Sequence, residues 1–67
     1  MEHLERIYAG QLRPGDVAAR TPHDPFCTVM EVRRDDLGFL SVVFQRDGRE
    51  CEVDEVPWRA FVRRTTG

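Results

Sequence analysis

Apolar and polar residues alternate along several short stretches of this 67-residue chain, and turn sequences separate the stretches. The alternation is clearest at 50–54, where Cys51 and Val53 stand between acidic residues. A period of two is typical of a β-strand with one buried face. The same kind of pattern predicts strands at about 16–20, 26–34, 39–45, 50–54 and 58–64. We therefore expect five short antiparallel strands and an all-β fold.

The turns between these stretches carry residues suited to special backbone angles. The Pro-Gly pair at 14–15 favours a type II turn, because proline presets φ and the glycine after it supplies a positive φ. Prolines at 22 and 25 exclude helix and central strand from the loop 21–25. The sequences at 35–38 and 47–48 favour tight hairpins, the second through the Asp-Gly pair that most strongly indicates one.

Three segments depart from simple alternation. Val29 breaks the period of the 26–34 strand, which a β-bulge at that point would explain. Apolar residues at 4, 7 and 8 have helical spacing, but the segment is short for a helix, so we favour an extended or single-turn conformation that ends at Gly10. Residues 55–57 interrupt the pattern before the last strand and have room for one short helical turn.

A five-stranded antiparallel sheet of this size has to curl, because a flat sheet would leave its apolar face in water. The apolar positions of the alternating stretches then form one small core. Its predicted members are Leu12, Val17, Met30, Val32, Leu40, Val42, Phe44, Cys51, Val53, Ala60 and Val62, with Trp58 at one end.

The order of these features resembles an SH3-like small β-barrel, in the layout shared by KOW-type and Tudor-type domains. The resemblance rests on the turn sequence 12–17, apolar pairs at 29 and 32 and at 42 and 44, the Asp-Gly-Arg turn 47–49 and a short final strand. It covers most of the chain and implies one domain over residues 1–67, a five-stranded antiparallel SH3-like barrel. It also implies that the long loop at 21–26 helps to line a groove. The basic and aromatic-cage residues of those families have no match here, so no functional residue is carried over.

Composition narrows the classes of function. Ten arginines, no lysine and twelve acidic residues give a formal net charge of -2, which argues against general coating of nucleic acid. Residues 47–55 hold five acids and one arginine, whereas 57–67 hold three arginines and no acid. A chain of this length cannot enclose a large active site. The exclusive use of arginine is typical of GC-rich coding sequence and indicates a bacterial or phage source.

The cysteines and the chain as a whole show no signal for metal, cofactor or membrane. No apolar run approaches the roughly 20 residues that span a bilayer, and the first residues lack a signal-peptide pattern. We therefore expect a cytoplasmic protein in which Cys27 and Cys51 are free thiols. His3 and His23 could join them at a metal, but no close cysteine pair is present. With no nucleophile–base arrangement or phosphate loop either, the sequence predicts no catalytic residue, no metal and no cofactor.

The candidate binding residues lie on the strand faces that turn away from the predicted core. Phe39 and Val43 share that face of the third strand, and Phe61 is flanked by Arg59 and Arg63 on the last. Aromatic residues beside arginine suit a contact with a protein and also a platform for single-stranded nucleic acid. If the strands bend strongly, Phe39 and Phe61 instead form a second layer of the core.

We expect a small non-enzymatic binding or adaptor module that contacts a protein partner or a second copy of itself. The predicted contact residues are Phe39, Val43, Trp58, Arg59, Phe61 and Arg63. The alternative is a small nucleic-acid-binding barrel of the KOW or cold-shock kind that uses Arg59, Arg63 and Arg64. The near-neutral charge favours the protein partner.

Overall fold

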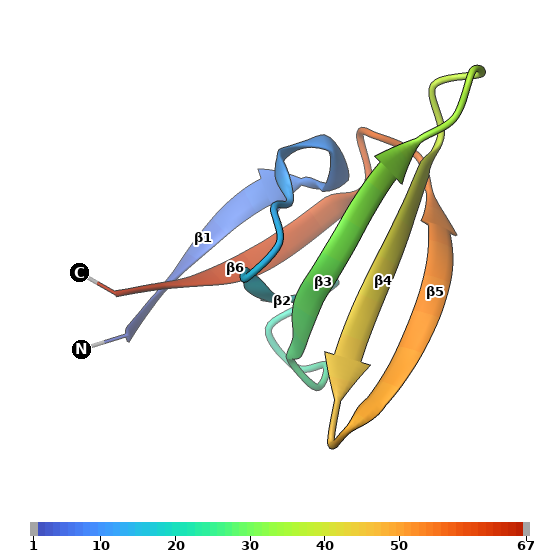
Figure 1. Ribbon diagram of the computed structural model, residues 1–67. Coiled ribbons are helices and arrows are strands. Elements are labelled where there is room, and N and C mark those ends of the chain that lie inside the picture. Colours follow the sequence, from blue (N-terminus) through green and yellow to red (C-terminus); the bar gives the residue numbers. More distant parts are fainter. Residues whose placement is uncertain (1, 67) are drawn as a thin grey trace.

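The structure of the protein is a computed structural model that describes residues 2–66, which form one antiparallel sheet of six strands (Figure 1). In chain order the elements are β1 (Glu2–Tyr8), the 3-10 helix η1 (Ala9–Gln11), β2 (Val17–Ala19), β3 (Cys27–Arg34), β4 (Leu40–Arg46), β5 (Arg49–Glu55) and β6 (Ala60–Thr66). The strands lie side by side in the order β1-β6-β2-β3-β4-β5. The predicted all-β antiparallel fold is confirmed. The count of five strands is wrong, because the first segment is extended and forms β1.

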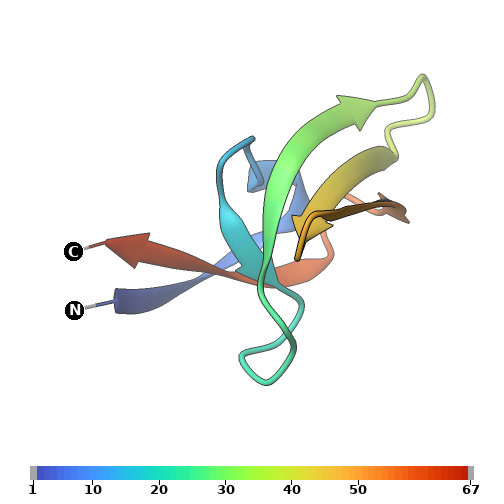
Figure 2. The same cartoon turned by 60° about the horizontal axis from the view of Figure 1, so that its bottom comes forward.

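The sheet has two parts joined by a narrow link. Strands β3, β4 and β5 form a meander, whereas β1 and β6 form a two-stranded ribbon that projects away from it (Figures 1 and 2). Strand β2 joins them through only two residue pairs with β6. Because the ribbon diverges beyond this link, no pairing joins the outer edges of β1 and β5 within residues 2–66. The sheet is therefore curled but open, and the prediction of a closed barrel is wrong.

The turns fold as their sequences predict. Gly15 has a φ of 96°, and the N–H of Asp16 donates to the carbonyl of Arg13 at 3.0 Å, as expected for a type II turn. Asp47 and Gly48 have φ of 53° and 78°, the type I′ geometry that matches the twist of paired strands. This two-residue turn fixes the register of β4 against β5.

A bulge in β3 accounts for the broken alternation around Val29. The register of β3 on β4 shifts between Val29, opposite Phe44, and Glu31, opposite Val43. Val29 is fully buried. Met30 is the extra residue of the bulge, and its side chain is 41% exposed. The predicted bulge is confirmed, and the prediction that Met30 belongs to the core is wrong.

The core lies on the inner face of the curled sheet. Its buried members are Ile7, Ala9, Leu12, Ala18, Val29, Leu40, Val42 and Phe61, with Val32 and Phe44 packed against them. The predictions for Leu12, Leu40 and Val42 are confirmed. Cys51 and Ala60 are exposed, so the predictions for these two residues are wrong. Strand β5 contributes little to the core, because all residues from Arg49 to Asp54 are exposed except Val53, which is half-buried.

Phe61 faces the core, so its predicted place on a partner-binding surface is wrong. It is 2% exposed and stacks on Phe44, with the ring centroids 6.1 Å apart. The sequence-based prediction counts the alternation of the last strand from Trp58. Strand β6 begins only at Ala60, and the turn before it changes which residues face inward. Val62, on the opposite face of β6, is also buried. The strand is thus covered on both sides, as the alternative of bent strands with two core layers anticipated.

Candidate functional site

The two other apolar residues of the predicted contact surface, Phe39 and Val43, lie on the outer face of the meander. Phe39 is 44% exposed just before β4, and Val43 is half-buried in a row between Glu31 on β3 and Glu52 on β5. Val43 lies on the face opposite Phe61, and the polar Ser41 separates it from Phe39. The role of Phe39 and Val43 in contacting a partner stays a prediction.

The outer face of the meander is acidic. Its carboxylates belong to Glu31 on β3 and to Glu50, Glu52 and Asp54, which occupy every second position of the edge strand β5. Arg33 lies among them, and its Nε donates to Glu31 Oε1 at 2.8 Å. That hydrogen bond and the charge of Glu31 raise the pKa of Arg33. Because Arg33 is engaged by Glu31, the acids of β5 dominate the charge at the edge of the sheet.

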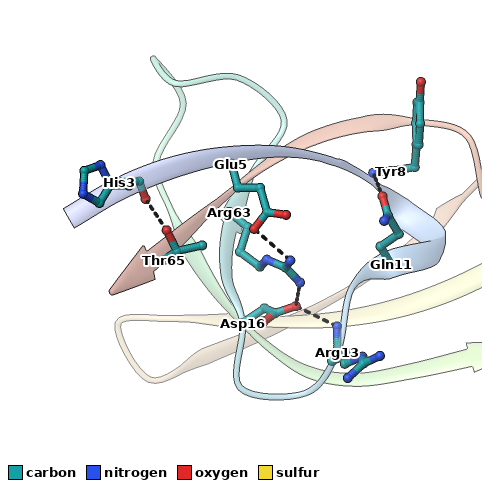
Figure 3. Close-up of polar contacts among 8 residues, drawn as sticks. All are labelled: His3, Glu5, Tyr8, Gln11, Arg13, Asp16, Arg63 and Thr65. Carbon is teal, nitrogen blue, oxygen red and sulfur yellow. Dashed lines mark hydrogen bonds and ion pairs between the residues drawn. The ribbon is translucent and has the colours of Figure 1, made fainter. Parts of the chain in front are cut away.

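Arg63 lies in an ion-pair network that ties the ribbon to the turn before β2 (Figure 3). Its Nη2 donates to Glu5 Oε2 at 3.0 Å and its Nη1 to Asp16 Oδ2 at 3.3 Å. Asp16 Oδ2 also accepts the backbone N–H of Arg13 at 2.8 Å. The hydrogen bond to Glu5 is the main cause of a raised pKa at Arg63, against the opposing effect of burial. The protein's own carboxylates thus hold this guanidinium, and the role of Arg63 in contacting a partner stays a prediction.

Replacing Arg63 by alanine should lower the free energy of unfolding by about 1–2 kcal/mol, because two carboxylates lose a charge-assisted partner. Arg63→Lys should restore only part of this, since lysine lacks the fork that reaches both. Because the pKa of Arg63 is raised in the folded state, its contribution is complete below the unfolded-state pKa and fades as the pH rises through the folded-state pKa. Urea unfolding should therefore give equal losses at neutral pH and at about pH 9. A stability of Arg63→Ala equal to that of the wild type contradicts the network's role.

A second ion cluster joins the end of β2 to the end of β5 and the turn after it. Glu55 is buried, with its side chain 2% exposed. Arg20 donates to Glu55 Oε2 from Nε at 3.0 Å and from Nη2 at 2.7 Å, and Arg59 Nε donates to Oε1 at 3.3 Å. Each carboxylate oxygen therefore has its own arginine. The sequence does hold a signal for this cluster, which the sequence-based prediction missed. Glu55 continues the inward phase of Cys51 and Val53, where a carboxylate needs a partner.

Trp58 lies beside this cluster on a turn that backbone hydrogen bonds hold in place. The N–H of Arg59 donates to the carbonyl of Val56 at 3.1 Å, and two N–H groups of η1 donate to the carbonyls of Pro57 and Arg59 at 2.9 and 2.8 Å. The turn is thus docked on η1 through its backbone. Trp58 is 70% exposed, so the prediction that it closes one end of the core is wrong.

The turn and the ion cluster together make a surface of aromatic and arginine side chains. Arg20 and Arg59 are each 53% exposed above the buried Glu55. A hollow beside them is lined by Arg20, Thr21, Asp24, Val56, Trp58, Arg59 and Ala60. The structure thus brings the predicted contact residues Trp58 and Arg59 together and adds Arg20. We call Trp58, Arg59 and Arg20 the Trp58 surface.

An apolar groove of about 370 Å³ lies between the β2–β3 loop and the inner face of β4 and β5. Its lining residues are Ala18, Ala19, Arg20, Asp24, Pro25, Cys27, Phe44, Cys51, Val53 and Phe61. The loop forms one wall through Asp24 and Pro25, as expected of a loop that helps to line a groove. Arg64 ties this loop to β6, with its Cζ 4.6 Å from the centroid of the Phe26 ring. The groove extends to β5, the strand at the edge of the sheet.

Cys27 and Cys51 both line this groove as free thiols, so that expectation is confirmed. Strand β4 lies between their two strands, which separates their backbones by about 10 Å, beyond the limit of about 7 Å for a disulfide. Within residues 2–66, no three His, Cys, Asp or Glu side chains come together as a metal site. No helix in the same range is long and apolar enough to cross a membrane.

Comparisons with known proteins found no match that could guide the interpretation of the site. No protein-family model matches the chain. No curated protein and no solved structure matches it either. The features that bear on function are the Trp58 surface, the apolar groove and the acidic edge strand.

Proposed function

We propose that this protein is a non-enzymatic binding module that recognises a protein partner through the Trp58 surface. The observation that carries the proposal is the 70% exposure of Trp58 on a turn that hydrogen bonds hold on both sides. Tryptophan and arginine, together with tyrosine, are enriched among the residues that contribute most to protein interfaces. A side chain presented by a rigid turn also loses less conformational entropy on binding.

The two arginines support this proposal by their geometry. Arg20 and Arg59 are about half exposed, yet both donate to the same buried carboxylate of Glu55. Their guanidinium groups are thus preset beside Trp58 before a partner arrives. Planar guanidinium groups held in this way suit partner carboxylates and aromatic faces.

Nucleic-acid binding is the less favoured alternative, because its three arginines are already engaged. Arg59 donates to Glu55, Arg63 donates to Glu5 and Asp16, and Arg64 stacks over a phenylalanine ring. Affinity for phosphate depends on cations that displace counterions, and neighbouring carboxylates weaken that effect. A protein partner requires no such excess of positive charge.

The relationship to SH3-like domains and a cytoplasmic location are further proposals. The first has the support of the turns at 14–15 and 47–48 and the loop 21–25, which separate short antiparallel strands in the expected order. The open edges and the additional strand β1 depart from the barrel layout. The proposal therefore concerns the arrangement from β2 onward.

Replacing Trp58 by alanine should abolish binding while leaving the fold intact. As an exposed side chain, Trp58 should contribute no more than about 0.5 kcal/mol to stability, whereas loss of an interface tryptophan weakens binding about tenfold or more. Affinity purification from the native host, followed by mass spectrometry, compares the wild type with Trp58→Ala. Leu37→Ala is the matched control, because Leu37 is 83% exposed on the β3–β4 hairpin and does not line the hollow beside Trp58.

The expected result is a protein that copurifies with the wild type and with Leu37→Ala but not with Trp58→Ala. Trp58 is the only tryptophan in the chain, so its fluorescence then measures the affinity of the purified partner directly. Equal recovery with all three proteins contradicts the proposal. Recovery of nucleic acid that high salt removes would favour the alternative instead.

A further inference from the structure

Strand β5 presents an unpaired edge with a defined set of backbone groups. It pairs with β4, and within residues 2–66 no strand pairs with its other side. The two-residue turn at 47–48 determines which residues of β5 form backbone hydrogen bonds with β4. These are Arg49, Cys51 and every second residue after them. The N–H and C=O groups of Glu50, Glu52 and Asp54 therefore point outward along the open edge. The edge offers donors and acceptors at regular spacing.

The two faces beside this edge differ in chemistry. On the inner face, Cys51 and Val53 belong to the apolar groove. On the outer face, the same strand carries the carboxylates of Glu50, Glu52 and Asp54. Directly opposite residues of two paired strands share a face of the sheet. A strand added to β5 thus places one set of side chains in the groove and the alternate set beside carboxylates.

A second copy of this edge is a poor occupant. Two β5 strands paired antiparallel place acids opposite acids, whichever of Glu50, Glu52 or Asp54 lies at the centre. Like charges directly opposite each other destabilise a pair of strands, and charged side chains at an edge prevent self-pairing. The same carboxylates attract a strand with basic side chains. Charge therefore selects against a β5–β5 dimer and in favour of a basic partner.

We propose that β5 accepts an extended segment of a partner protein as an additional antiparallel strand, in which apolar side chains alternate with lysine or arginine. The apolar side chains enter the groove beside Cys51 and Val53, and the basic ones lie opposite Glu50, Glu52 and Asp54. The outward backbone groups of β5 supply the ladder, as in other cases of strand addition. The groove shares Arg20 with the Trp58 surface, but the backbone ladder and the carboxylates of this site belong to β5, so the proposal goes beyond the function proposed for Trp58.

The probe is a blocked seven-residue peptide of alternating lysine and valine, N-methylated at its valines. In the proposed register the lysine N–H groups face β5 and the valine N–H groups face away. Methylation at valine therefore spares the ladder and prevents the peptide from pairing with itself. The matched control carries the methyl groups at lysine instead and should not bind. A second control with glutamate in place of lysine should bind about tenfold more weakly or worse.

Binding is measured by fluorescence anisotropy of labelled peptides and by amide shifts in NMR spectra of the protein. We expect the largest shifts at Glu50, Glu52 and Asp54 and weaker binding as salt is added. The triple variant Glu50→Lys, Glu52→Lys and Asp54→Lys should reverse the preference and bind the glutamate peptide better. Circular dichroism checks its fold, and Glu52→Gln gives a milder charge change if the triple variant unfolds.

The outcomes separate this proposal from the Trp58 surface. Trp58→Ala should bind the lysine peptide as the wild type does, so either proposal can fail while the other stands. Equal binding of the lysine and glutamate peptides, or of the two methylated forms, overturns the proposal. So does a wild-type mass that rises with concentration in sedimentation and returns to the monomer in the triple variant, because a second copy then occupies the edge.

Discussion

Phe61→Ala should leave a large fraction of the protein unfolded at room temperature, whereas Phe39→Ala should fold like the wild type. Phe61 is 2% exposed and stacks on Phe44 in the centre of the core. Loss of a buried phenylalanine ring costs about 3–5 kcal/mol, and a core of this size supplies a net stability of only about 3–5 kcal/mol. Phe39 is 44% exposed, so its loss should cost roughly 1 kcal/mol or less.

Thermal and urea unfolding followed by far-UV circular dichroism measure both variants. Phe61→Leu should lie between the wild type and Phe61→Ala, because leucine fills part of the space that alanine leaves empty. Two equally stable alanine variants would contradict the assignment of Phe61 to the core. The comparison decides between the two roles that the sequence left open for these phenylalanines.

Removing Arg20 and Arg59 together should cost about 3 kcal/mol, near the lower end of the range for a buried charge that loses its partners. The side chain of Glu55 is 2% exposed, and these two arginines account for the bonds to both of its carboxylate oxygens. Each single variant should cost less than half as much, because the remaining arginine still neutralises the carboxylate. The half-exposed arginines lie between Glu55 and solvent, so their removal lets water reach the carboxylate, which keeps the loss at this lower level.

The control is the triple variant Arg20→Ala, Arg59→Ala and Glu55→Gln. Glutamine keeps the size of Glu55 but removes the buried charge, so most of the lost stability should return. Urea unfolding of the five proteins, wild type included, measures the non-additivity of the two arginines directly. A triple variant no more stable than the double variant would show that the arginines act through packing rather than through charge.

The turns and the bulge could be predicted from the sequence, because each depends on residues that are neighbours in the chain. Glycine at 15 and the Asp-Gly pair at 47–48 determine local backbone angles, and their turns form as predicted. The break in alternation at Val29 likewise indicates a bulge. Side chains of a strand point to one of only two faces, so one extra residue exchanges the faces of all that follow. The strand count and the open edges depend on which distant strands meet, and local patterns carry no information on that.

The candidate site also contains some residues that the sequence predicted and others that it did not. Trp58 and Arg59 were singled out by residue type, and their exposure follows from a turn that docks on η1. The partners of Arg63 were beyond prediction, because Asp16 lies 47 residues away in the chain and Glu5 lies 58 residues away. The burial of Phe61 was missed because alternation was extended through a turn, where it does not hold.

The ribbon joins the beginning of the described chain to its end, with Glu2 paired to Thr66. The hairpins of the meander close over turns of a few residues, whereas the ribbon needs a loop that includes the whole meander. Closing long loops costs entropy and slows folding. During synthesis the meander can form while β6 is still missing, and β2 then has a neighbour on one side only. The seven residues of Ala60–Thr66 therefore determine when a newly made chain becomes a complete domain.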